Sequence, residues 1–537
     1  MPNFKKVLLV ILDGFGVASS SPGNAITRGK MRAFNSLVNH FPSMTLQAAG
    51  PNVGLAWGEP GNSEVGHMCL GAGRIVLQDL PRIDRSISSG EFYSNPAFAQ
   101  AIEQVKKNHS TLHLIGLLGD GGVHASQFHL YSLLTMAAVK GVTSINLHII
   151  LDGRDTAPDA GLGYLSALEK KIIEIGAGKI VTLVGRFYAM DRAQHWDLTE
   201  AAYKAIVLGQ GELAAGPSQA LDAYYAQSIF DETIPPTVIT DPVTAKPSSM
   251  KPGDALIFYN FRTDRAIQLT QALLDPGKTG MAGKYSPIEN LLVVTMTEYS
   301  QALSGAVAAF PKVVVPQTLP QVLSAHHKHQ YHISETEKFP HVTYFFSNGR
   351  EQPGSNEVWD QVKSSSSYKE LYQNVPQMAS GELTVKLLKK LAEPIEFFLV
   401  NFANPDMVGH TGSLEASVKA VETVDACLEA LVKYALESRD LAVLITADHG
   451  NVENIHDVQT GRIRKAHTTN PVPLILAGHG LKLKNPRTEG YLYLASQIPE
   501  GLLSDVAPTI LDVFEIEKPV EMTGISLLAK FLKQVQS

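Results

Sequence analysis

Short apolar runs alternate with polar loops and with longer amphipathic stretches over most of the chain. In its middle part, four apolar runs have the length of buried strands, at residues 112–118, 145–151, 180–184 and 255–259. Stretches with helical spacing, at residues 128–140 and 161–175, separate members of this set. Because strands that alternate with helices are typical of βαβ units, we predict a mostly parallel sheet here.

Three more apolar runs lie near the two ends of the chain, at residues 7–12, 397–403 and 441–446. Asp13 ends the first run in a glycine-rich turn. Asp406 and His410 follow the second run four positions apart, so a helix would present both on one face. Asp448 and His449 follow the third run, at the carboxyl end of a predicted strand, where α/β sheets place their ligands.

Carboxylate and imidazole groups without a nearby thiolate form a ligand set that suits a divalent cation such as Mn²⁺ or Zn²⁺. A single Asp-His pair after a strand is explained as well by a turn with a solvated histidine. Two such pairs favour a metal site, and His467, in the proline-bounded segment 466–471, offers one more imidazole. One ion cannot use all of these groups, so we predict two ions.

Ser63 lies in the glycine- and proline-rich segment 58–67, just before a possible helix. Backbone N–H groups at such a helix start could hold a phosphate. A serine in this place is more often a helix N-cap than a nucleophile. Its hydroxyl becomes a competent nucleophile when a base or a metal takes up its proton, and the predicted metal ligands offer that means.

The order of these residues indicates an inserted domain. Asp13 and Ser63 lie near the start of the chain, whereas the other candidate ligands follow residue 400. One site must therefore be assembled from both ends. We place the boundaries near Leu77 and in the stretch 310–316, which gives a metal-binding domain of residues 1–76 and 316–537 and an inserted domain of residues 77–315.

Several predicted strands of the insert lead into loops that carry arginine. These residues are Arg154, Arg186, Arg192, Arg262 and Arg265. Any one of them alone would be read as a solvated surface charge. Together they offer planar forks that bind phosphate and carboxylate through paired hydrogen bonds, so a small substrate that bears both groups fits this pattern.

Composition narrows the class of protein further. The 537 residues include 45 basic and 52 acidic side chains, and the net charge of −7 provides no global field for nucleic acid or an anionic membrane. With only Cys69 and Cys427, neither a disulfide framework nor a cysteine-based zinc site is supported. No stretch approaches the roughly 18 apolar residues of a membrane span. We therefore expect a soluble cytoplasmic protein without nucleic-acid or membrane partners.

Five motifs carry a resemblance to a known family. They are Leu12-Asp13-Gly14 and residues 61–67, 404–410, 446–451 and 466–473. In this order they resemble the cofactor-independent phosphoglycerate mutases of the alkaline phosphatase superfamily, along nearly the whole chain. The resemblance implies an α/β fold of two domains, an alkaline-phosphatase-like α/β sandwich interrupted by an inserted α/β domain with a mostly parallel sheet. It also implies a monomer that interconverts 3-phosphoglycerate and 2-phosphoglycerate in glycolysis and gluconeogenesis, without 2,3-bisphosphoglycerate.

The resemblance also assigns roles to single residues. It gives one ion to Asp13, Ser63, Asp448 and His449, and a second ion to Asp406, His410 and His467. It places Lys338 against the phosphate and gives substrate binding to His124, Arg154, Asp155, Arg186, Arg192, Arg262 and Arg265. It implies Mn²⁺ in many bacterial members, although the ligand types also admit Zn²⁺ and Co²⁺.

The implied reaction forms a phosphoserine at Ser63 while glycerate stays bound to the insert. Glycerate then turns, and Asp155 is the candidate for exchanging protons with its two hydroxyl groups. Because water would hydrolyse an open phosphoserine, we expect the two domains to close on the substrate.

Two regions depart from the family pattern. The loop 119–126 keeps His124 but has Gly119, Ala125 and Ser126 where the family has Ser, Ser and His. Residues 352–377 lack the usual proline- and arginine-containing pattern and include the serine run 364–367. None of the assigned ligands lies in the second region.

Three alternatives remain open from the sequence. A phosphopentomutase or phosphatase of the same superfamily would keep the metal ligands, but the arginine-rich insert argues against it. A mutase that requires 2,3-bisphosphoglycerate relies on a phosphohistidine, and the chain has no Arg-His-Gly motif to support one. A non-catalytic scaffold would need a broken ligand set, and every ligand is present.

Overall fold

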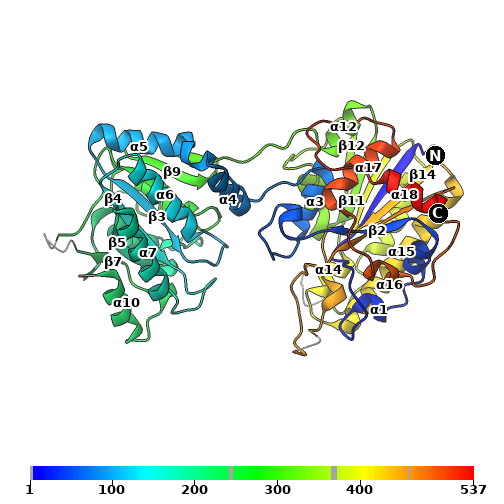
Figure 1. Ribbon diagram of the computed structural model, residues 1–537, viewed down its shortest axis with the longest axis horizontal. Helices are drawn as coiled ribbons and strands as arrows, with labels where there is room; N and C mark the ends of the chain where they lie inside the picture. The colour runs from blue at the N-terminus through cyan, green and yellow to red at the C-terminus, as the bar shows by residue number, and fades with distance from the viewer. Residues whose placement is uncertain (1–3, 241–245, 365–371, 458–459) are drawn as a thin grey trace. The chain divides into compact units, whose positions relative to one another are not determined.

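The protein is described here by a computed structural model that covers residues 4–240, 246–364, 372–457 and 460–537. The chain divides into two compact units (Figure 1). Unit 1 comprises Met1–Gln78 and Val314–Ser537, and unit 2 comprises Asp79–Val313. Both are α/β, so the predicted two-domain α/β class is confirmed.

Unit 1 is built on an eight-stranded sheet with the order β12-β11-β13-β1-β14-β15-β2-β16. The strands are β1 (Lys6–Leu12), β2 (Ser43–Gln47), β11 (Gln330–Glu335), β12 (Glu357–Val362), β13 (Phe397–Phe402), β14 (Leu441–Thr446), β15 (Val472–Ala477) and β16 (Gly501–Leu502). Strands β12, β11, β13, β1 and β14 are parallel to one another, whereas β15 is antiparallel to β14 and β2. The carboxyl ends of β13, β1 and β14 therefore meet at one edge.

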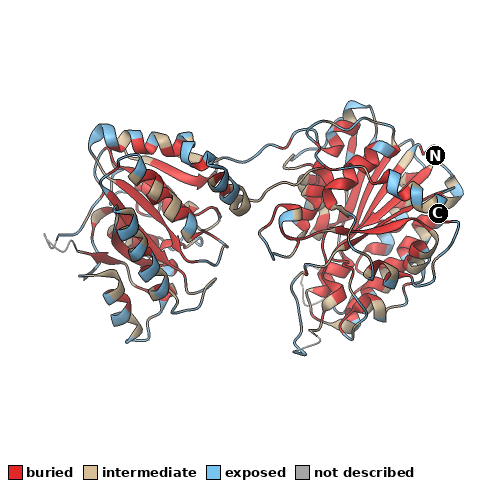
Figure 2. Ribbon diagram, in the orientation of Figure 1, coloured by how far each residue is buried: buried red, intermediate tan, exposed pale blue. Residues whose placement is uncertain are grey.

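The three strands predicted near the chain ends are confirmed as β1, β13 and β14. Their side chains are almost all buried, as expected for parallel strands covered on both faces. The helices of unit 1 are α1 (Ala25–Arg28), α2 (Arg32–His40), α3 (Ser63–Ala72), α12 (Leu319–Ala325), α13 (Ser380–Leu391), α14 (Asn404–Gly409), α15 (Leu414–Ser438), α16 (Tyr491–Ala495), α17 (Val506–Val513) and α18 (Leu528–Gln536). Figure 2 shows buried strands at the centre of the unit and exposed residues on its outer helices.

Unit 2 has its own eight-stranded sheet, with the order β10-β9-β8-β3-β4-β5-β7-β6. Its strands are β3 (Leu112–Leu118), β4 (Ile145–Leu151), β5 (Lys179–Gly185), β6 (Glu212–Ala214), β7 (Thr237–Ile239), β8 (Ala255–Phe258), β9 (Leu292–Thr297) and β10 (Ala306–Phe310). Only the β5–β7 pair is antiparallel among the pairings of the described residues, so the predicted mostly parallel sheet is confirmed.

Helices flank the sheet of unit 2. They are α4 (Asp79–Ser89), α5 (Pro96–Asn108), α6 (Gln127–Val139), α7 (Gly161–Ile175), α8 (Arg186–Ala189), α9 (Trp196–Tyr203), α10 (Pro217–Tyr225) and α11 (Ile267–Leu274). The helices predicted at residues 128–140 and 161–175 are present as α6 and α7. Within the described ranges, no helix combines the length and apolar character needed to cross a membrane.

The region 352–377, which departs from the family pattern, is partly described. It contributes β12, the edge strand beside β11. Ser364 donates a hydrogen bond to Glu337, and the Tyr372 hydroxyl donates to the same carboxylate over 2.5 Å. The rest of the serine run, Ser365–Ser367, lies outside the described residues.

Candidate active site

Three aspartates lie together at the carboxyl ends of β1, β13 and β14. Asp13 directly follows β1, Asp406 lies in the first turn of α14 just after β13, and Asp448 follows β14. Their approach requires a glycine next to Asp13. Gly14 has a φ of +72°, and a Cβ atom there would lie 2.9 Å from the Asp406 Cβ atom, which is too close for two carbon atoms.

Ser63 is the first residue of α3, and its hydroxyl points into this cluster. Its Oγ atom lies 2.9 Å from His449 Nε2 and 3.3 Å from Asp13 Oδ1. The helix is capped by the preceding residue, because the Asn62 side chain accepts a hydrogen bond of 3.0 Å from the Val65 N–H. Ser63 is therefore free of the capping role that the sequence left open, and its hydroxyl is available for chemistry.

Lys338 brings a positive charge to the serine. It ends the short helical turn Thr336–Lys338 that follows β11. Its Nζ atom donates to Ser63 Oγ over 2.6 Å, to Asp406 Oδ2 over 2.7 Å and to Asp13 Oδ1 over 2.8 Å. Burial lowers the pKa of this ammonium, but the two carboxylates outweigh burial and raise the pKa above its usual value, so Lys338 stays charged.

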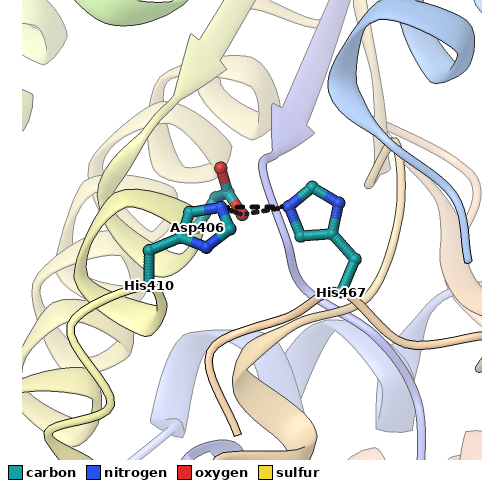
Figure 3. Close-up of side chains that lie close together, drawn as sticks. All are labelled: Asp406, His410 and His467. Atoms are coloured by element: carbon teal, nitrogen blue, oxygen red, sulfur yellow. Dashed lines mark hydrogen bonds and ion pairs between the residues drawn. The ribbon is translucent and has the colours of Figure 1, made fainter. Parts of the chain in front are cut away.

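Asp406, His410 and His467 form a first set of converging ligand atoms (Figure 3). The Nε2 atoms of the two histidines lie 3.3 and 3.2 Å from Asp406 Oδ1 and 3.0 Å from each other. Each Nδ1 atom faces a backbone carbonyl, at 2.7 Å for His410 and 2.8 Å for His467. A proton on each Nδ1 atom, donated to these carbonyls, is the tautomer that leaves the Nε2 lone pairs for a metal ion.

Asp13, Asp448 and His449 lie close together as a second set, and all three are buried. Around them, ligand atoms converge in the groups Asp13, His67 and Asp448, and Asp13, Asp406 and His449. His449 Nε2 lies 3.5 Å from Asp448 Oδ2 and 3.6 Å from Asp13 Oδ1. Burial lowers the pKa of His449 to about 4, so its imidazole is neutral at ordinary pH. Burial and the neighbouring Asp448 charge raise the pKa of Asp13 to about 7, which reflects the crowding of negative charge.

The chemistry of the two sets fits divalent cations. Three buried carboxylates face one ammonium, and His449 presents a neutral nitrogen atom to two of them. Asp448 Oδ2 is buried without an aligned donor, since the nearby His67 N–H points at the Ser63 carbonyl 2.8 Å away. A buried carboxylate oxygen without a hydrogen-bond donor destabilises the fold unless a cation binds it.

Polar residues that the sequence analysis did not identify hold these ligands in place. The Asn401 amide donates to Asp13 Oδ2 over 2.7 Å, and the Asn451 amide donates to Asp406 Oδ1 over 2.8 Å. The sequence does contain a signal for Asn401, because it is a polar residue within the apolar run of β13. A cavity of about 660 Å³ opens over the cluster, lined by Ser63 and Lys338 among others.

Unit 2 gathers a second group of predicted residues beyond the ends of β4 and β5. Arg186 Nη1 donates to Asp155 Oδ2 over 2.6 Å and to Asp152 Oδ1 over 2.5 Å. His124 Nε2 lies 3.7 Å from Asp155 Oδ2, and burial with the Arg186 charge lowers the pKa of His124 to about 4. Arg186, Arg154 and Arg265 line a cavity of about 380 Å³.

The other two predicted arginines of unit 2 share one carboxylate. Asp264 accepts from Arg192 Nη1 over 2.6 Å and from Arg262 Nε over 3.0 Å. Asp264 and Asp152 were not singled out as site residues, although both stand in the loops that carry the arginines. Asp264 accepts from two guanidinium groups, and Asp152 accepts from one guanidinium group and two backbone N–H groups, so both aspartates shape the arginine cluster.

Comparisons with known proteins identify the family. A family model described as BPG-independent PGAM N-terminus matches residues 83–301, and one described as type I phosphodiesterase / nucleotide pyrophosphatase matches residues 274–495.

The 2,3-bisphosphoglycerate-independent phosphoglycerate mutase of Clostridium novyi is 43% identical over 525 residues, which cover 97% of this chain and 99% of that protein. The protein of the same name from Chloroflexus aggregans is 43% identical over 549 residues, with 98% and 99% covered. A crystal structure of Leishmania mexicana phosphoglycerate mutase at low cobalt concentration aligns with a TM-score of 0.60 and 28% identity, covering 97% of each chain. The chain therefore belongs to the family of 2,3-bisphosphoglycerate-independent phosphoglycerate mutases.

Proposed function

We propose that this protein interconverts 3-phosphoglycerate and 2-phosphoglycerate by moving the phosphoryl group to Ser63 and back. Family membership supports the overall reaction. The observation that carries the mechanism is the position of Ser63 Oγ, which lies 2.6 Å from Lys338 Nζ and 2.9 Å from His449 Nε2. A serine hydroxyl beside a buried ammonium and a set of metal ligands is suited to become a nucleophile.

Two divalent ions fit the ligand sets. Asp13, Ser63, Asp448 and His449 would hold one ion, and Asp406, His410 and His467 would hold the other. When bound, such ions lower the pKa of a hydroxyl and offset charge on phosphoryl oxygens. We propose Mn²⁺ as the native ion, while Zn²⁺ and Co²⁺ suit the same donor types.

The protein's own groups perform the transfer. The Ser63 hydroxyl first gives its proton to solvent, and the Lys338 charge stabilises the alkoxide. The alkoxide attacks the phosphorus atom, and the bond from phosphorus to the substrate oxygen breaks. Asp155 gives a proton to the departing oxygen and later takes one from the other hydroxyl of glycerate. That second oxygen then attacks the phosphorus atom of the phosphoserine, the bond from phosphorus to Ser63 Oγ breaks, and the Ser63 alkoxide is restored.

The arginines of unit 2 would hold glycerate between the two transfers. Arg154, Arg186 and Arg265 line one cavity, and their guanidinium groups suit a carboxylate. We assign Arg192, Arg262 and His124 to the same task. Retention of glycerate matters, because water that replaced it would hydrolyse the phosphoserine and turn the enzyme into a phosphatase. In this proposal the enzyme is a monomer of the cytoplasm that serves glycolysis and gluconeogenesis.

Trapping the intermediate tests this proposal. The Mn²⁺-loaded protein is mixed with 3-phosphoglycerate and quenched in acid within milliseconds, and its peptides are analysed by mass spectrometry. We expect a phosphate on Ser63 that is absent from the Ser63→Ala variant. Catalysis by the Ser63→Ala variant at the rate of the unmodified protein would refute the serine mechanism.

A further inference from the structure

Glu453 is a buried carboxylate that the proposed mechanism does not use. It lies in the short helical turn Val452–Asn454, just after the loop that carries Asp448 and His449, and only 1% of it is exposed. An ionised side chain is seldom buried to this extent without several hydrogen-bond donors. Its donors come from three different loops of the metal centre.

The Oε2 atom of Glu453 joins the loops after β1 and β14. It accepts from the Gly16 N–H over 3.0 Å and from the Asn451 N–H over 2.9 Å. Gly16 follows Asp13 by three positions, and Asn451 follows His449 by two. One oxygen atom therefore holds together the two loops whose side chains form the second ligand set.

The Oε1 atom reaches the third loop. It accepts from the Thr468 hydroxyl and, over 2.9 Å, from the Asn470 side-chain amide. Thr468 directly follows the ligand His467, and its N–H donates to the Gly450 carbonyl over 3.0 Å. Through Oε1 the carboxylate thus also fixes the loop that serves the first ligand set.

Two glycines leave the space that this carboxylate occupies. A Cβ atom at Gly16 would collide with all three terminal atoms of the Glu453 side chain, and a Cβ atom at Gly450 would collide with Glu453 Oε1 and with Thr468 Oγ1, which donates to it. Gly16 leaves room for the carboxylate, and Gly450 leaves room for the carboxylate and its Thr468 donor. The three loops therefore pack closely around the Glu453 side chain.

We propose that Glu453 is a positioning residue that aligns the ligand sets of both metal ions. This inference rests on the two-ion site of the proposed function. Outer groups that orient metal ligands typically contribute 10- to 100-fold to metal affinity. Because Glu453 touches the loops of both sets, its loss weakens both ions, whereas loss of a single ligand weakens one.

The Glu453→Gln substitution tests the role with little change in volume. A glutamine has one oxygen and one NH₂ group, so whichever way the amide turns, two of the four donors lose their acceptor. Mn²⁺ binding is measured by calorimetric titration and by the electron paramagnetic resonance signal of free Mn²⁺. We expect Glu453→Gln to weaken both Mn²⁺ sites by 10- to 100-fold.

Asp425→Asn is the matched control. Asp425 is also buried in unit 1, and its two oxygen atoms accept from the Phe34 N–H over 2.7 Å and the Ala33 N–H over 2.9 Å. It ties α2 to α15 and touches none of the ligand loops. Asp425→Asn should therefore lower the melting temperature while leaving Mn²⁺ affinity unchanged.

Thr468→Val is a milder second variant that keeps the role testable if Glu453→Gln does not fold. It removes one donor of the third loop only, so it should weaken the ion of Asp406, His410 and His467 more than the other ion. Mn²⁺ affinities of Glu453→Gln and Thr468→Val equal to those of Asp425→Asn would overturn the positioning role. That outcome is separate from a failure of the proposed reaction, which is read from the products of the unmodified protein.

Discussion

The Lys338 Nζ atom lies 2.6 Å from the Ser63 Oγ atom, although the two residues are 275 positions apart in the sequence. The same ammonium bridges Asp13 and Asp406, which come from different strand ends. Lys338 is therefore the one cation, among the described side chains, that contacts the proposed nucleophile and carboxylates from both proposed ligand sets.

We predict that Lys338→Met reduces kcat for phosphoglycerate by about 10²- to 10³-fold, since it removes a charge that stabilises the transferring group. In the metal-free protein, Lys338→Met leaves buried carboxylates without their cation and should cost about 3–5 kcal/mol of stability.

Urea unfolding in EDTA and then in Mn²⁺ measures the free energy of unfolding of both proteins. Mn²⁺ should restore most of the stability that the variant loses. Equal destabilisation with and without Mn²⁺ would show that Lys338 and Mn²⁺ do not neutralise the same carboxylates.

The two histidines of Figure 3 should control one ion only. His410→Ala removes one of the two Nε2 atoms that face Asp406 Oδ1, so we expect bound Mn²⁺ to fall from two ions to one per chain. Metal content after dialysis gives the stoichiometry. The control is His326→Ala, at the end of α12, which should retain both ions. Two tightly bound ions in His410→Ala would contradict the ligand assignment.

In unit 2, we expect Arg186→Lys to impair substrate binding without changing metal affinity. A lysine cannot reproduce the contacts of one guanidinium with both Asp152 and Asp155, which lie at 2.5 and 2.6 Å. A rise in KM of at least tenfold, together with a lower kcat from a misplaced Asp155, is the expected result in steady-state assays. Unchanged KM and kcat values would show that Arg186 does not take part in substrate binding.

Glu335, at the end of β11, should make stability depend on pH. Burial raises the pKa of its carboxyl from 4.5 to about 7. A folded-state pKa above the unfolded value gives stability that is complete below pH 4.5 and lost as pH rises through about 7. The loss amounts to about 3 kcal/mol at most.

Glu335→Gln should abolish this dependence. Urea unfolding at pH 5 and pH 7.5 measures the free energy of both proteins, and the variant should gain stability relative to the unmodified protein as the pH rises. A constant difference between the two proteins at both values would show that the buried carboxyl is not protonated in the fold.

The local pattern of the sequence predicted the elements that bear the ligands. The runs that became β1 and β14 are almost entirely apolar and lead directly into Asp13 and into Ala447-Asp448, so both the strands and the positions of these two aspartates could be predicted. The four-residue spacing of Asp406 and His410 likewise predicted a shared helix face, and the two side chains lie 3.3 Å apart. Strands β6 and β7 were not predicted, because three residues are too few to show a period.

The contacts of the supporting residues could not be predicted, because their partners are distant in the sequence. Asn401 contacts Asp13 across 388 positions, and Glu453 contacts Gly16 across 437. Nothing in the local sequence around an asparagine or a glutamate indicates which loop it will meet. Such contacts depend on the order of strands in the sheet, which places β13 beside β1 and β14 on the other side of β1.

Phosphorus NMR of 3-phosphoglycerate with this protein tests the central claim most directly. The protein is stripped of metal, then supplied with Mn²⁺, in a sample free of 2,3-bisphosphoglycerate. We predict that 2-phosphoglycerate forms only after Mn²⁺ is added, with no inorganic phosphate. Release of inorganic phosphate in place of 2-phosphoglycerate, or no change with any divalent ion, would contradict the mutase assignment.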